Sequence, residues 1–306
     1  MRIKIVPVVF ILLLFFTNSS YITEHSKVCK IKDSILSSNR DSIPQLGMFF
    51  DKKRYVPVAL PVFSDTKSKL PEPIFDENPK YVECYWKAWS LAFKQFRQPQ
   101  KSSNLVSNYI DEAFNEALFL WDTSFMTMFC NYGHPYVSGI QSLDNFYCTQ
   151  MNDGEIVREI SEITGQPRVQ YAKPGTPASL NHPILAWAEV ESYKMTNDKK
   201  RLKMVYPALA AYFKSYAKIL DEKSGLYLGT WASMDNSPRI PGMLCSIDTS
   251  SEVVLFARNL AFIAKIQQLT IHMNACIMDR FYFLLLFQMK IRIKKCQMQN
   301  LIMPWM

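Results

Sequence analysis

Histidine is scarce in this chain of 306 residues, and two motifs of common enzyme classes are absent. The four histidines, at positions 25, 134, 182 and 272, lie far from one another in the sequence, which argues against a zinc site. The sequence has no G-x-S-x-G motif and no glycine-rich phosphate loop. It therefore gives no signal for a serine-hydrolase elbow, for nucleotide binding or for any cofactor.

An excess of positive charge is also missing from the middle of the chain, although the whole sequence carries a net charge of +8. Residues 1–40 contain six basic and two acidic side chains, and residues 265–306 contain six basic and one acidic. The remaining residues, 41–264, therefore sum to −1. A nucleic-acid partner is not expected, because such a partner requires a basic patch on the folded body.

The first 24 residues have the pattern of a secretory signal peptide. Arg2 and Lys4 precede an apolar run that ends in small polar residues, and this run is shorter than the ~20 residues of a membrane span. We expect a secreted protein (extracellular, periplasmic or in the lumen of the endoplasmic reticulum) without a stable membrane span after cleavage. An uncleaved anchor is the alternative. The seven cysteines are widely spaced, which argues against a disulfide scaffold and leaves one or two bridges open.

The rest of the sequence reads as a lead-in segment followed by a mostly helical body. Residues 25–78 form the lead-in, whose second half is rich in proline and short extended runs. Between residues 79 and 268, apolar and polar residues do not alternate convincingly as they would in strands. Asn181 or His182 is placed to cap a helix. Apolar periodicity predicts helices at 79–96, 121–131, 136–164, 183–196, 200–220 and 249–268. These helices come in pairs, which suggests a toroid or solenoid of helical hairpins, and the lack of a fixed period disfavours a TPR-like or HEAT-like array.

Carboxylates among aromatic residues are the remaining chemical signal. Asp122 follows Trp121 at the start of a predicted helix, where an acid is also favoured by the helix dipole. Trp187 lies four residues before Glu191 on one helical face, although a tryptophan there is commonly a core residue. Glycoside cleavage uses carboxyl groups of this kind, one as an acid and one as a base, beside aromatic rings that stack on sugars.

Two further acidic positions add to this pattern. Asp144 and Asn145 lie in "QSLDNFY" and can be simple helix-start residues. Asp235 lies in "GTWASMDNSPRI", where "DNSP" can be a turn. Burial among aromatic residues raises the pKa of a carboxyl, as a general acid requires, so this stretch is also a plausible place for one.

Taken in order, these motifs resemble glycoside hydrolase family 63 and the trehalase-like glycosidases. The motifs are W-D-x-x-F from residue 121, D-N-F from residue 144, a polar-x-P helix start at residue 181 and D-x-x-x-R from residue 235. The resemblance covers residues 79–268 and is closer to the bacterial-type branch of family 63 than to trehalase. It implies an all-α fold, a partial (α/α)6 toroid with about half of the helical hairpins.

The resemblance also implies an activity and a set of site residues. The activity is hydrolysis of O-glycosidic bonds in α-glucosides and oligosaccharides by an inverting mechanism. Asp235 would be the general acid, and Trp121 and Asp122 would line the sugar-binding subsite. Asn145 and Arg239 would be wall residues of that site, and Trp187 is added as a candidate stacking residue from its place on the helix.

The sequence after residue 268 departs from the family pattern. Residues 269–306 contain a single acid, Asp279, and no glutamate, whereas the family's catalytic base is a glutamate. We interpret the chain as a truncated catalytic domain with an atypical tail, and we expect it to be inactive because an inverting mechanism needs both carboxyl groups. A basic amphipathic tail is the alternative interpretation of this segment.

Two other functions stay open at this point. One is a non-catalytic carbohydrate-binding remnant that keeps Trp121, Asp122 and Trp187. The other is a helical interaction protein without a sugar site.

Overall fold

The computed structural model describes residues 54–112, 115–168, 180, 182–229 and 247–268. The predicted signal peptide, the first part of the lead-in, the stretch around Asp235 and the tail lie outside these ranges. In the described part the chain is mostly helical, as predicted, with four short strands that the sequence did not suggest. The α-helices are α2 (Phe63–Thr66), α3 (Pro79–Phe93), α4 (Leu120–Tyr132), α5 (Asp144–Tyr147), α6 (Leu185–Thr196), α7 (Lys199–Ser215) and α8 (Ile247–Ile266).

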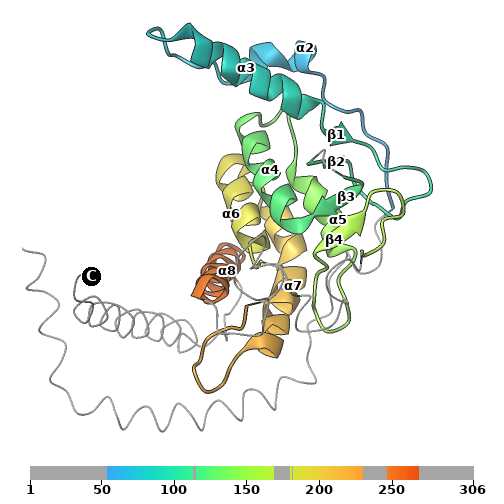
Figure 1. The fold of residues 1–306 in the computed structure, drawn as a ribbon, viewed down its shortest axis with the longest axis vertical. Coiled ribbons are helices and arrows are strands. Elements are labelled where there is room, and N and C mark those ends of the chain that lie inside the picture. The colour runs from blue at the N-terminus through green and yellow to red at the C-terminus, as the bar shows by residue number, and fades with distance from the viewer. Residues whose placement is uncertain (1–53, 113–114, 169–179, 181, 230–246, 269–306) are drawn as a thin grey trace, which may run out of the picture. The chain divides into compact units, whose positions relative to one another are not determined.

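The main core lies where α4, α6, α7 and α8 pack together (Figure 1). In this group α4 lies beside α6, and α8 lies beside both α6 and α7. Helices α6 and α7 form a tight hairpin, because Asn197 takes a left-handed conformation and Asp198 then caps α7 by accepting a hydrogen bond from the backbone N–H of Arg201 (3.0 Å). Helix pairs of this kind were expected, whereas the toroid itself is not shown.

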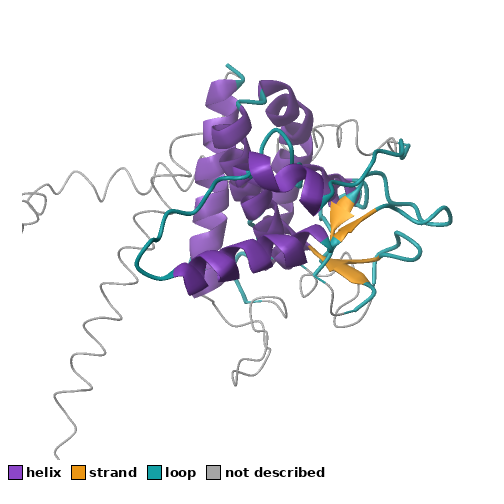
Figure 2. Ribbon diagram, turned by 90° about the horizontal axis from the view of Figure 1, so that it is seen from above, coloured by secondary structure: helices purple, strands orange, loops and turns teal. Residues whose placement is uncertain are grey.

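Two small antiparallel sheets lie together on one side of the helices (Figure 2). Strand β1 (Phe96–Arg97) pairs with β2 (Tyr109–Ile110), with Phe96 opposite Ile110. Strand β3 (Ala117–Phe119) pairs with β4 (Glu159–Ser161), with Leu118 opposite Ile160. Strand β3 runs directly into α4, so this sheet fixes where α4 begins.

The predicted long helix over residues 136–164 is wrong. This region contains a 3-10 turn (Ile140–Leu143), the short helix α5, a loop and strand β4. Gly154 has a φ of +92° in the loop, and a Cβ there would lie 2.2 Å from the backbone oxygen of Ala211. A residue with positive φ ends helical periodicity, which the apolar pattern alone did not reveal.

The start of α6 also differs from the prediction. The helix begins at Leu185 with Ile184 as its N-cap and has no side-chain cap, so His182 is not the cap. Asn181, the other candidate, lies outside the described residues.

The lead-in segment shares a core with α3. Leu70 is buried with Trp89 and Phe93 of α3, and Leu60 and Phe63 pack against the same cluster. Residues 60–70 therefore belong to a folded region, in which α2 and a 3-10 turn (Lys67–Lys69) precede α3. Among the residues that the structure describes, no helix combines the length and apolar character needed to cross a membrane.

Candidate functional site

Three aromatic side chains from α4 and α6 form a partly exposed surface. Trp121 and Phe125 are one turn apart on α4, with ring centroids 4.9 Å apart. Phe125 also contacts Trp187 of α6, with centroids 5.3 Å apart. Phe125 is 44% exposed, and both tryptophans are partly buried. We call these three residues the aromatic surface; the packing of α4 on α6 creates it.

A histidine–glutamate pair adjoins the aromatic surface. The ring of His182 lies 4.1 Å from the ring of Trp121, between centroids. Its Nδ1 lies 2.7 Å from Oε2 of Glu252 on α8. The pair therefore joins three elements, namely α4, the segment before α6 and α8.

A second group of polar residues lies at the first turn of α4. Asp122, next to Trp121, is partly exposed there. Thr123 donates a hydrogen bond from its hydroxyl to Oε1 of Glu112 (2.8 Å). Oε2 of Glu112 is buried and has no hydrogen-bond partner within the described residues. Burial, together with the nearby charges of Asp122 and Asp111, raises the pKa of Glu112 to about 8, despite the opposing hydrogen bond from Thr123. Glu112 therefore keeps its proton at neutral pH.

Asn145 has a buried, structural environment. Its Oδ1 accepts hydrogen bonds from the backbone N–H groups of Val106 (2.8 Å) and Ser107 (3.1 Å), and its Nδ2 donates to the oxygen of Ser107 (3.2 Å). Its exposed fraction is 1%. These contacts hold residues 106–107 against α5 and fully explain why an asparagine is needed here. A role for Asn145 in the wall of a sugar site stays a prediction.

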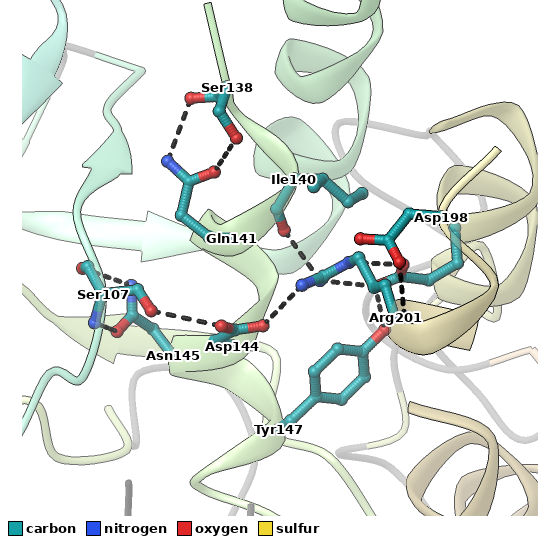
Figure 3. Close-up of polar contacts among 10 residues, drawn as sticks. Ser107, Ser138, Ile140, Gln141, Asp144, Asn145, Tyr147, Asp198 and Arg201 are labelled. Carbon is teal, nitrogen blue, oxygen red and sulfur yellow. Dashed lines mark hydrogen bonds and ion pairs between the residues drawn. The ribbon is translucent and has the colours of Figure 1, made fainter. Parts of the chain in front are cut away.

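The helix that carries Trp187 is fixed by a buried ion cluster, in part visible in Figure 3. Arg201 of α7 donates to both carboxyl oxygens of Glu189 (2.8 Å each), to Oδ1 of Asp144 (3.0 Å) and to the backbone oxygen of Ile140 (3.0 Å). Tyr147 donates a further hydrogen bond to Oε1 of Glu189 (2.9 Å). Glu189 is two residues from Trp187, so this cluster sets the position of α6 relative to α5 and α7.

The partners of Arg201 keep its guanidinium protonated. Burial by itself lowers the pKa of this guanidinium, but the charges and hydrogen bonds of Glu189 and Asp144 outweigh burial and raise it. We call Arg201, Glu189, Asp144 and Tyr147 the Arg201 cluster. Its role is to position elements, because its groups bond to one another and their side chains are at most 10% exposed.

The predicted site residues thus fall into three sets. Trp121 and Trp187 come together through Phe125, and Asp122 is adjacent to Trp121. Asn145 lies in the buried contact with residues 106–107. Asp235 and Arg239 lie outside the described residues, so their predicted roles stay predictions. Glu191, on the same helix as Trp187, pairs with Lys194 (2.6 Å).

Four residues on or near the aromatic surface were not predicted as site residues from the sequence. Phe125 had a usable signal, since it stands four residues after Trp121 in the quoted W-D-x-x-F motif. His182 was assigned to a helix cap, and Glu252 gave no signal because it is 70 residues from its partner. Glu112 had no signal, because its burial depends on how the start of α4 packs.

Acidic and histidine side chains of the described ranges do not gather into a group that could hold a metal ion. No protein-family model matches the chain. Over 128 residues, or 37% of this chain, it is 28% identical to an uncharacterized protein of Borreliella burgdorferi. The match spans 24% of that relative's length. Because the relative is itself uncharacterized, a functional argument has to come from the residues of this chain.

Proposed function

We propose that this chain binds an α-glucoside oligosaccharide on the aromatic surface. The observation that carries the proposal is the contact of Trp121, Phe125 and Trp187, with Phe125 nearly half exposed and Asp122 beside Trp121. Rings present apolar faces to the C–H groups of a sugar, and a carboxylate at their edge accepts hydrogen bonds from its hydroxyls. The motif resemblance to family 63 supplies the sugar class.

The resemblance also supplies the wider setting of this proposal. A partial (α/α)6 toroid is the proposed architecture, supported by the α6–α7 hairpin and by the packing of α4 and α8 on α6. Secretion of the protein is proposed from the signal-like pattern of residues 1–24.

Binding is tested by titrating the full chain with maltotriose in a calorimeter. We expect Phe125→Ala to weaken binding about tenfold, because truncation of a central aromatic contact commonly costs more than 1 kcal/mol. Tyr81→Ala is the matched control, since Tyr81 is an exposed aromatic residue on α3 (63%) and should leave affinity unchanged. Equal affinity of the wild type and Phe125→Ala would reject this surface as the binding site.

Hydrolysis is the second candidate function, favoured by the carboxyl of Glu112 that keeps its proton near Asp122. Glycosidases need one protonated and one ionised carboxyl group, with about 6.5–9.5 Å between them in inverting enzymes. The predicted acid is Asp235, and the expected base is not apparent in the sequence. Hydrolysis of a nitrophenyl α-glucoside that is lost in Asp235→Asn would establish catalysis. A wild-type rate equal to the rate without protein would leave sugar binding as the function.

A further inference from the structure

The contact between His182 and Trp121 suggests a role for a residue pair that the proposed function does not yet use. The ring of Trp121 contacts two other rings, that of Phe125 at a centroid distance of 4.9 Å and that of His182 at 4.1 Å. The His182 ring is itself held by Glu252, at 2.7 Å from Nδ1. The side chains of His182 and Glu252 are only 15% and 20% exposed. One carboxylate on α8 thus fixes an imidazole that contacts the indole on α4.

Such an arrangement affects binding through the freedom of the indole. Immobilising a side chain on binding costs about 0.5–1.5 kcal/mol, so a ring that is already fixed binds its ligand more tightly. A carboxylate that bonds one ring nitrogen also sets the orientation of the imidazole. The imidazole then restricts the indole on the side where it lies.

We infer that His182 and Glu252 are a positioning pair that pre-orders Trp121 for sugar binding. This inference rests on the proposed function of the aromatic surface. The pair does not need to touch the sugar, because its effect passes through the orientation of the indole. It follows that the effect of Glu252 on affinity depends on the presence of Trp121.

A double-mutant cycle on the full chain tests this dependence, with maltotriose as the probe. Glu252→Ala should weaken binding about 2- to 10-fold when Trp121 is present and leave it unchanged in the Trp121→Ala background. Glu252→Gln retains an oxygen that accepts from Nδ1–H and should restore affinity to within about twofold of wild type. Glu83→Ala on α3 is the control for loss of an exposed carboxylate.

An equal loss in both backgrounds would overturn the inference, because it would mean direct contact with the sugar or a general effect on the fold. No loss in either background would also overturn it.

A measurement without ligand separates this inference from the proposed function. The near-ultraviolet circular dichroism of Glu252→Ala should differ from wild type, and the difference should disappear when both proteins carry Trp121→Phe. If maltotriose does not bind the wild type, the proposed function fails, and this spectrum alone decides whether the pair orders Trp121. A difference that persists in the Trp121→Phe background, or no difference at all, would contradict the positioning role.

Discussion

Two groups of acidic residues in this molecule, one fully buried and one partly buried, have their negative charge offset in different ways. In the Arg201 cluster, the carboxylates of Glu189 and Asp144 face a guanidinium that donates to both. After strands β2 and β4, Glu162 forms a hydrogen bond with the carboxyl of Asp111, and Glu112 accepts a hydrogen bond from the neutral hydroxyl of Thr123. Arg97 reaches Asp111 from 3.6 Å and is 40% exposed. We call Asp111, Glu112 and Glu162 the carboxyl cluster.

The difference between the clusters lies in what balances the negative charge. In the Arg201 cluster one guanidinium, which stays protonated at any ordinary pH, offsets part of the negative charge of two carboxyl groups, and burial raises the pKa of Glu189. In the carboxyl cluster a proton balances the negative charge. Burial and the charge of Asp111 raise the pKa of Glu162 to about 7, and the pKa of Glu112 rises to about 8. The stability that the Arg201 cluster provides should therefore be lost on mutation of one residue, whereas the stability that the carboxyl cluster provides should change with pH.

The largest expected effect is the loss of Arg201. Arg201→Met leaves the buried carboxylates of Glu189 and Asp144 without a counter-ion, which should lower the free energy of unfolding by about 3–5 kcal/mol. Urea denaturation at pH 7 measures this change. Lys194→Met is the control, since it removes an exposed ion pair with Glu191 and should change stability by less than about 1 kcal/mol. Similar values for the two variants would mean that the Arg201 cluster does not fix α6.

The next effect in size is a pH dependence from the carboxyl cluster. Glu112 and Glu162 hold protons in the folded chain that the unfolded chain, with a pKa of 4.5, releases. The contribution of these two carboxyl groups to the free energy of unfolding is therefore fully present below about pH 4.5, and it is lost as the pH rises towards 7 and 8. Each of the variants Glu112→Gln and Glu162→Gln should reduce this loss of stability at high pH by about 1–2 kcal/mol. This value is smaller than the whole pKa shift would give, because both side chains are only part-buried.

Urea denaturation at pH 5 and pH 8 measures that dependence. Both glutamine variants should be more stable than wild type at pH 8 and close to it at pH 5. Glu83→Gln on α3 is the control and should follow the wild type at both pH values. If the glutamine variants were instead less stable than wild type at pH 8, the carboxyl groups would have to be ionised and paired in the folded chain.

The comparison also shows which parts of the structure could be predicted from sequence. Helices α3, α4, α6, α7 and α8 follow from apolar periodicity over eleven or more residues, and the predicted ranges agree with them within a few residues. The strands are two or three residues long, too short for an alternating pattern to appear. The error over residues 136–164 has another cause: the chain leaves the helical conformation after Tyr147 and turns at Gly154, whose φ is positive, whereas apolar residues on both sides of this turn resemble one continuous helical pattern.

The candidate site was predictable only in part, for a similar physical reason. Trp121, Asp122 and Trp187 stand out because of their local sequence, and the structure brings the two tryptophans together through Phe125. The pairing of His182 with Glu252 and the contacts of Arg201 with Asp144 join residues far apart in the chain. Local patterns carry no information on such contacts, which depend on how α5, α6, α7 and α8 pack.

Sugar binding by the aromatic surface is the central claim, and the melting temperature measures it most directly. A ligand that binds only the folded chain stabilises it by RT ln(1 + [L]/Kd) and so raises this temperature, by more at higher ligand concentration. We expect maltotriose to raise the melting temperature of the wild type and of Tyr81→Ala, and to leave that of the Trp121→Ala, Trp187→Ala double variant unchanged. An equal rise in wild type and double variant, or no rise in the wild type at millimolar maltotriose, would contradict the claim.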